Sequence, residues 1–257
     1  MKQFRSILPI LILLGASSAG NAVEPPLPPL ATVLSNAVQT ARLESVNDHN
    51  FNQHYFYTRT KVTEYHNAAG DLKKHDEKQT INDPTRAAAR KLAQVAEINQ
   101  PKTGSPSDTQ TNVRGKAADE KDFTFNDDFL KRFTCTLAGR EMINGRSALV
   151  IDFKPSGDNL PVNNIKDKFI NHAAGRAWID ESDYALVKGQ AHLTQQVNIF
   201  GGLAGAVWKF TYSFDRERTA DGLWFPRDVD WHLEGREVVI DRIVDYHEKT
   251  TDVRKAP

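Results

Sequence analysis

From residue 133 onward, the sequence is a succession of short β-type segments joined by turn residues. Aromatic and β-branched side chains recur in these segments, and turn signals such as Asn144-Gly145 separate them. With an earlier hairpin, the expected strands are residues 55–65, 72–81, 133–143, 147–153, 176–180, 184–197, 207–218, 223–233 and 236–247. Short hairpin connections predict antiparallel neighbours, because parallel strands need long crossovers. The chain is therefore expected to form one antiparallel sheet that is strongly curved or partly closed.

Apolar residues alternate with polar ones along these strands, so one face of the sheet is expected to be apolar. Trp208, Phe210 and Tyr212 occupy every second position of one strand, and two other strands repeat the pattern. Two alternatives fit such a face: a core packed solid by helices, or a partly filled core that leaves a cavity for an apolar ligand. The predicted ligand-binding residues are Leu149, Ile151, Phe153, Trp208, Phe210, Tyr212, Val229 and Trp231.

Three segments predict helices that could cover the apolar face. Residues 30–41 carry apolar side chains at helical spacing along one stripe. Asp83 and Pro84 provide the N-cap and first position of a second helix, which is expected to run to about residue 98. Asn126 is expected to cap a short third helix. The fold class predicted from these patterns is α+β and mainly β.

The N-terminus has the three-part pattern of a secretory signal peptide. Lys2 and Arg5 precede an apolar run at residues 7–16, which is too short to span a bilayer, and small residues follow to Ala22. A bacterial periplasm is the expected location. The expected organisation is a signal peptide at 1–22, a proline-rich leader at 23–29, one domain at 30–250 with a mobile polar loop at 101–122, and a tail at 251–257.

Composition and motifs exclude several function classes. The chain has 33 basic and 33 acidic residues, and this balance argues against a nucleic-acid partner. Cys135 is the single cysteine, so no internal disulfide can form. The histidines are scattered; His192, His232 and a nearby Asp could meet in the fold, but their spacing does not favour a metal site. The chain also has no Walker loop, no dinucleotide-binding glycine motif, no H-E-x-x-H and no G-x-S-x-G, so we expect no catalytic residue, no metal and no cofactor.

Several short motifs follow one another in a fixed order along the chain. They are Arg132-Phe133, Gly145-Arg146, residues 152–155 (DFKP), residues 175–180 (GRAWID) and residues 221–226 (DGLWFP). With the secretion signal and the amphipathic first helix, this order resembles the outer-membrane lipoprotein-sorting-protein-like family, which is related in fold to the Lol-type periplasmic lipoprotein carriers. The resemblance implies an unclosed antiparallel β-barrel whose concave face is covered by helices. It also implies binding of lipid acyl chains or lipoproteins, without catalysis.

Three functional hypotheses remain open from the sequence. The leading one is a periplasmic binding protein that shelters a lipid acyl chain or a lipoprotein, in envelope lipid or lipoprotein trafficking. The second is an envelope signalling module that binds a protein partner. The third is an enzyme acting on envelope glycolipid or peptidoglycan, which would need histidines and carboxylates converging in the pocket. The sequence leaves the oligomeric state open.

Overall fold

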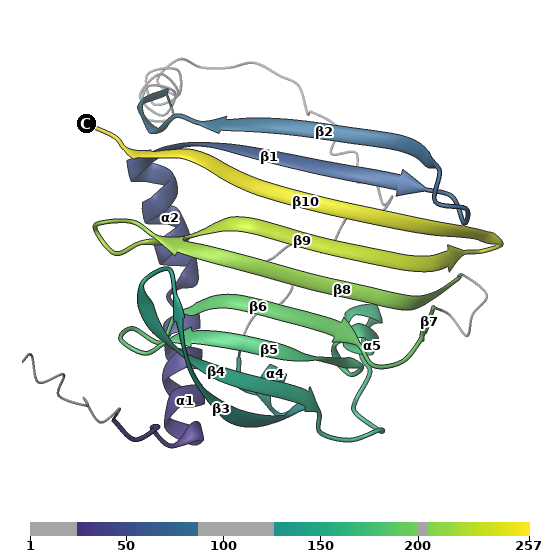
Figure 1. Cartoon of the computed structure of the whole chain (residues 1–257), viewed down its shortest axis with the longest axis horizontal. Coiled ribbons are helices and arrows are strands. Elements are labelled where there is room, and N and C mark those ends of the chain that lie inside the picture. The colour runs from purple at the N-terminus through teal and green to yellow at the C-terminus, as the bar shows by residue number, and fades with distance from the viewer. Residues whose placement is uncertain (1–24, 87–125, 200–204) are drawn as a thin grey trace, which may run out of the picture.

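The structure is a computed structural model that describes residues 25–86, 126–199 and 205–257. Its main feature is one antiparallel sheet with the strand order β2-β1-β10-β9-β8-β6-β5-β4-β3, to which β7 adds by pairing with β8 (Figure 1). The strands are β1 (Tyr55–His66), β2 (Leu72–Asn82), β3 (Phe133–Ile143), β4 (Arg146–Pro155), β5 (Ala173–Asp180), β6 (Leu186–Leu193), β7 (Val197–Ile199), β8 (Gly205–Arg218), β9 (Trp224–Glu237) and β10 (Ile240–Lys255). The edge strands β2 and β3 are not paired with each other, so the sheet is open.

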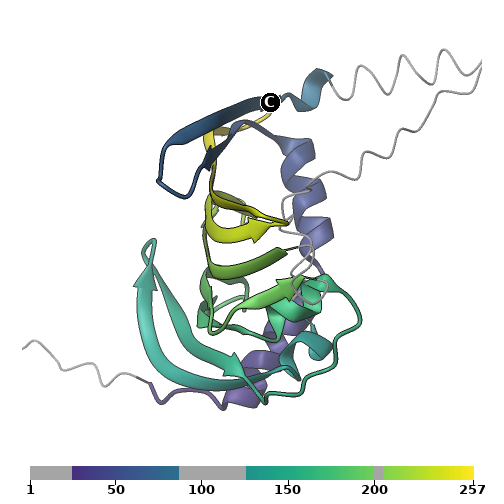
Figure 2. The same ribbon diagram turned by 90° about the vertical axis from the view of Figure 1, so that its right-hand side faces the viewer.

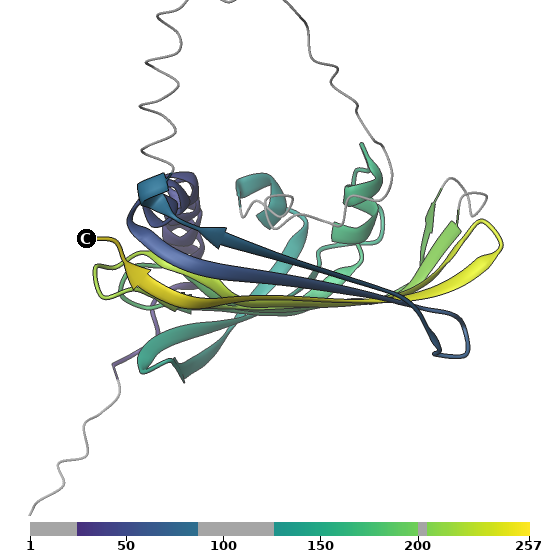
Figure 3. The ribbon, with the colours of Figure 1, turned by 90° about the horizontal axis from the view of Figure 1, so that it is seen from above.

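The described helices lie on one face of this sheet, within its curve (Figures 2 and 3). They are α1 (Leu30–Ala41), α2 (Glu44–His54), α4 (Asp127–Leu130) and α5 (Ile165–Ile170). In Figure 1, α1 and α2 follow each other across the strands near one end of the sheet. The predicted fold class, α+β and mainly β with a curved open antiparallel sheet covered by helices, is confirmed.

Several sequence predictions concern residues outside the described ranges. The signal peptide at 1–22, the body of the helix expected after Pro84 and the mobile loop at 101–122 all fall there. The start of that helix is described: the Asp83 side chain accepts backbone hydrogen bonds from Thr85 and Arg86 at 3.1 and 3.2 Å, as an N-cap does. The proposed domain limits stay a prediction.

The turn between β3 and β4 shows why the sequence determines this hairpin. Asn144 and Gly145 have φ angles of 49° and 77°, the left-handed conformation that a two-residue turn of this type requires. Glycine adopts this region without steric cost, and asparagine tolerates it better than most residues. The strands on either side pair from Ile143 with Arg146 to Phe133 with Pro155. The hairpin predicted at this position is confirmed.

Strand β4 is buried on both faces. On the helix side, Leu149 and Ile151 pack with Ile179 against Val33 and Ala37 of α1. On the opposite side, the alternate residues form a second apolar cluster with side chains of β5, β6 and β9. This second cluster consists of Ala148, Val150, Trp178, Ala185, Val187 and Trp224. The amphipathic stripe of α1 is thus used as predicted, while the outer face of the sheet is more apolar here than a simple alternation suggests.

Helix α1 ends at Ala41, and α2 is a separate helix. Unlike α1, which packs on the sheet through an aliphatic stripe, α2 packs on it through one aromatic ring. Phe51 of α2 stacks on the rings of Tyr55, Tyr57 and Phe225, with centroids 5.2, 5.1 and 4.9 Å away. All four residues are buried. This aromatic cluster fixes the C-terminal end of α2 over β1 and β9.

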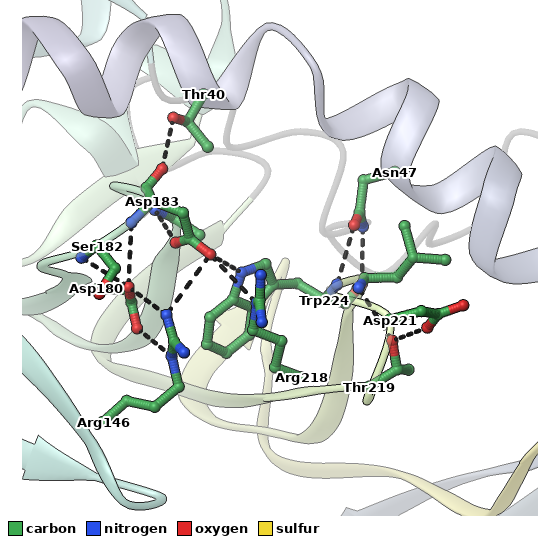
Figure 4. Close-up of polar contacts among 12 residues, drawn as sticks. Thr40, Asn47, Arg146, Asp180, Ser182, Asp183, Arg218, Thr219, Asp221 and Trp224 are labelled. Carbon is green, nitrogen blue, oxygen red and sulfur yellow. Dashed lines mark hydrogen bonds and ion pairs between the residues drawn. The ribbon is translucent and has the colours of Figure 1, made fainter.

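Directed hydrogen bonds fix the other end of α2 (Figure 4). The side-chain amide of Asn47 donates to the carbonyl of Trp224 at 2.7 Å and accepts from its backbone N–H at 2.9 Å. The Trp224 indole donates to Asp183 at 3.0 Å, and the carbonyl of Asp183 accepts from the Thr40 hydroxyl at 2.9 Å. Asn47 therefore gives the backbone of Trp224 the two hydrogen bonds that a neighbouring strand would otherwise provide. Through these contacts, α1 and α2 are attached to the turns at one end of the sheet.

Several strand boundaries differ from the sequence expectation: β5 begins at Ala173 rather than at residue 176, and the turn expected between residues 233 and 236 lies at Val238 and Val239. The segment 184–197 is divided into β6 and β7, because the second part pairs with the start of β8. Strand β10 continues to Lys255, which pairs with Tyr55, so residues 251–255 are strand where a tail was expected. Its charged end is held by pairing with β1, which the residue pattern alone does not reveal.

Replacing Asn47 with alanine is expected to destabilise the protein by about 2 kcal/mol, because both backbone groups of Trp224 lose their partner. Urea unfolding followed by circular dichroism measures this change. The control is Gln53→Ala, which removes an exposed amide from the same helix and should leave the unfolding free energy nearly unchanged. Equal stability of the two variants would show that the Asn47 bonds do not hold α2.

Candidate functional site

A cavity of about 720 Å³ lies between the sheet and the helices. Its floor is formed by side chains from β4, β5, β6 and β8, and its cover by side chains from α1, α2, α4 and α5. The apolar floor includes Ile151, Phe153, Ala177, Ala191, Phe210 and Tyr212. Apolar cover residues include Leu34, Ala37, Phe129, Leu130, Phe169 and Ile170. The helices therefore leave an unfilled space over part of the sheet face that the sequence predicts to be apolar.

The side of the cavity formed by α2 is polar. Glu44, Ser45, Asp48, His49 and Asn52 line it. Because these side chains retain hydrogen-bonding groups, they cannot pack densely into an apolar floor without losing hydration. The polar face of α2 explains why a cavity remains where a solid core could have formed.

The structure places four of the eight predicted ligand-binding residues on the cavity wall: Ile151, Phe153, Phe210 and Tyr212. Leu149 and Val229 share the same face but are buried in packed regions, with exposures of 0% and 5%. Trp231 lies beside the floor, stacked on Tyr246 at 5.2 Å and 6.3 Å from Phe210. Their role in ligand binding stays a prediction.

Trp208 differs from the other predicted residues. The pairing of β8 with β9 shifts between Val207 and Lys209, which marks a β-bulge. A bulge inserts one residue and interrupts the alternation, so counting every second position from Phe210 back to Trp208 does not give its face. Trp208 is 40% exposed and is not among the described residues that line the cavity.

One glycine in the floor has a clear steric role. A Cβ atom added to Gly189 of β6 would lie 2.3 Å from the ring of Phe214, which belongs to the neighbouring strand β8. The Phe214 ring therefore occupies the space of the missing side chain. Alternation along β8 indicates the face of Phe214, whereas nothing in the sequence around Gly189 predicts this contact.

A buried ion pair forms another part of the cavity wall. Arg216 of β8 is 5% exposed, and its guanidinium binds both carboxylate oxygens of Glu44 of α2. The same guanidinium donates to the carbonyl of Leu186 at 3.2 Å. Burial raises the pKa of Glu44, although the charge of Arg216 and the hydrogen bonds from it act in the opposite direction. The sequence predictions did not include this pair, since its partners are far apart in the chain.

Cys135 also lines the cavity, at the β3 side. It is half-buried, and this burial raises the pKa of its thiol. A reactive cysteine needs the opposite change, because the thiolate is the nucleophile. Its environment therefore suits a small apolar wall residue.

The opposite face of the sheet carries a polar groove of about 780 Å³. Within it, His232 lies between two carboxylates, 2.6 Å from Asp245 and 2.9 Å from Glu234. His192 also lines this groove. Among the described residues, no group of three His, Cys, Asp or Glu side chains is arranged to hold a metal ion.

No family model and no curated protein matches the chain. Solved structures are similar to it at 10–12% identity, each with a TM-score of 0.34. One is a domain named as an outer membrane lipoprotein-sorting protein from Vibrio parahaemolyticus, at 12% identity over 86% of this chain and 93% of that chain. A second is a LolA superfamily protein from Nitrosomonas europaea, at 10% identity over 88% and 94% of the two chains.

A third is a DUF1329 family protein from Desulfovibrio piger, at 11% identity over 89% and 94%. Within the described residues, no helix has the length and apolar character needed to cross a membrane.

We expect the pKa of His232 to lie above its usual value. Burial would lower it, but the hydrogen bonds to Asp245 and Glu234 outweigh burial and raise it. The protonated form is thus favoured in the folded state, so this contribution to stability is present at acid pH and is lost as pH rises through the folded pKa.

An NMR titration of the imidazole resonances measures this pKa, and Asp245→Asn should lower it. His232→Gln should cost more stability at about pH 5.5 than at about pH 8.5. A titration midpoint that does not change in Asp245→Asn would contradict the assignment.

Proposed function

We propose that this chain is a periplasmic binding protein that shelters an apolar chain, such as the acyl chain of a lipid or of a lipoprotein. The observation that carries this proposal is the cavity of about 720 Å³ between the sheet and the helices, with its apolar floor. Ligand sites in proteins are typically concave, largely apolar and about 300–1,000 Å³ in volume. The signal-peptide pattern at residues 1–22 supports the periplasmic location.

The driving force would be the hydrophobic effect. Each buried methylene contributes about 0.8 kcal/mol, so a chain of about 14 carbons supplies on the order of 10 kcal/mol before the cost of ordering the ligand. The rings of Phe153, Phe210 and Tyr212 offer broad contact surfaces for such a chain. The raised pKa of Cys135 favours binding over nucleophilic catalysis at this wall.

A second candidate function is an envelope module that binds a protein partner. The turn between β9 and β10 exposes three adjacent aliphatic residues, Val238, Val239 and Ile240, at 60%, 82% and 57%. Val238 also has a φ of 56°, which is rare for a β-branched residue. Exposed apolar side chains together with local backbone strain favour a contact surface at this turn.

The single cysteine provides a direct test of ligand binding in the unmodified protein. Cys135 should react slowly with N-ethylmaleimide, because it is half-buried and the pKa of its thiol is raised. Hexadecanol in the cavity should slow the reaction further, and unfolding in urea should abolish the protection. Mass spectrometry of the alkylated protein follows the rate. A rate that does not change with hexadecanol would argue against a ligand chain near β3.

Filling the cavity should weaken binding more than folding. Ala177→Phe places a ring in the floor and should lower the affinity for the apolar dye Nile red about tenfold, if the ring displaces the contacts of about two methylenes. The control is Ala174→Phe, which adds the same ring to the other face of β5, in the polar groove. Fluorescence titration gives the affinities, and circular dichroism monitors folding. Equal affinities of the two variants would contradict the proposed binding site.

A further inference from the structure

We infer that the cavity selects an amphiphile with an acidic head group, which binds the guanidinium of Arg216 in place of the Glu44 carboxylate. This inference rests on the proposed function and specifies the class of ligand. The acidic group is a carboxylate or a phosphate ester, because a guanidinium binds both in the same two-point geometry. The chain of the ligand then lies along the apolar floor.

The first step concerns the unused capacity of Arg216. Arg216 is 5% exposed and lines the cavity, and its guanidinium donates to Glu44 and to the Leu186 carbonyl. The Nε–H is buried and has no hydrogen-bond acceptor among the described residues. A buried donor without an acceptor is costly, so a group that supplies one is favoured. An anion entering the cavity offers such an acceptor and also retains the charge balance.

The second step concerns how easily Glu44 can leave. Its side chain is 39% exposed, whereas that of Arg216 is 6% exposed, so the carboxylate is the partner with access to solvent. Glu44 is also the first residue of α2, where the helix dipole stabilises a negative charge without any ion pair. Burial raises the pKa of Glu44, which indicates that its present place is unfavourable for a charged carboxylate. Glu44 can therefore move toward water while α2 stays attached.

The third step concerns the path of the apolar chain. Phe210, Tyr212, Phe214 and Arg216 occupy every second position of β8, and all four line the cavity. Six residues of strand span about 20 Å, so an acidic group at Arg216 is followed by a row of aromatic side chains. A basic end and an apolar row on one strand match the two parts of a fatty acid or a single-chain lipid phosphate.

Other charged groups on this wall do not offer the same site. Arg42 and Arg176 also line the cavity, but their side chains are 66% and 42% exposed and are paired with Asp127 at 3.1 Å and Asp152 at 2.6 Å. An exposed, solvated arginine contributes little to anion affinity. Asp48 and His49 face the cavity from α2, and the acidic side chain of Asp48 opposes an anion near it. Arg216 is thus the buried guanidinium on which the preference should depend.

The experiment compares ligands that share a chain of 16 carbons and differ in the head group. Palmitate, hexadecyl phosphate and hexadecanol displace Nile red from the purified protein at neutral pH, below their aggregation concentrations. We expect the better of the two anions to bind about tenfold to a hundredfold more tightly than hexadecanol, as hydrogen bonds to a charged group provide. The anion that binds more tightly identifies the carboxylate or the phosphate as the preferred head group.

Variants test the role of each partner. Glu44→Gln should increase the affinity for the preferred anion several-fold relative to the affinity for hexadecanol. The double change Glu44→Gln with Arg216→Met removes both charges, which avoids an unpaired buried carboxylate, and should abolish the preference. The matched control is Lys188→Gln, which removes the partner of Asp215 on the opposite face. This control should bind like the unmodified protein.

The outcomes separate the inference from the proposed function. If hexadecanol binds and neither anion binds more tightly, the cavity is a chain-binding site and the inference is wrong. A preference that survives in the folded double variant, verified by circular dichroism, also overturns it. If none of the three compounds displaces the dye or protects Cys135, the proposed function fails and the inference fails with it.

Discussion

Helix α2 presents polar side chains to an apolar sheet, and the rest of the site depends on this mismatch. A helix is normally held by burying an apolar stripe, as α1 does with Val33 and Ala37. Helix α2 is held instead at two places, by the Asn47 bonds to Trp224 and by the stack on Phe51. Between these two contacts, the polar side chains of α2 lie above the apolar floor of the cavity and do not fill the space over it. Attachment by discrete contacts therefore fixes the helix and leaves the cavity below it.

Much of this arrangement could be predicted from the sequence, for reasons that particular residues illustrate. Alternation identified Ile151, Phe153, Phe210 and Tyr212, because no extra residue is inserted within β4 or between Lys209 and Asp215 of β8. The Asn144-Gly145 turn fixed its hairpin through backbone conformation alone. Trp208 shows where this reasoning ends. A β-bulge depends on how two strands fit together, so a period of two counted along one strand cannot reveal it.

The ion pair at the cavity wall shows a second limit. Glu44 and Arg216 lie 172 positions apart, and neither belongs to a local motif that indicates a partner. The sequence predicts that both side chains are charged, but only the packing of α2 across β8 brings them together. The extension of β10 to Lys255 has the same cause, since pairing with β1 holds a segment that is too charged to suggest a strand. Long-range pairing decided both features.

The open edges of the sheet bear on how strictly a ligand must fit. A closed barrel has a diameter set by its strand number and stagger. Here β2 and β3 have no bonds to each other, so the sheet can bend more or less while every ladder of hydrogen bonds between its strands stays intact. Under the proposed function, the curvature of the sheet would adjust to the size of the bound chain. Variation in the length and branching of that chain would then be tolerated, and selectivity would depend on the polar groups that bind the other end of the ligand.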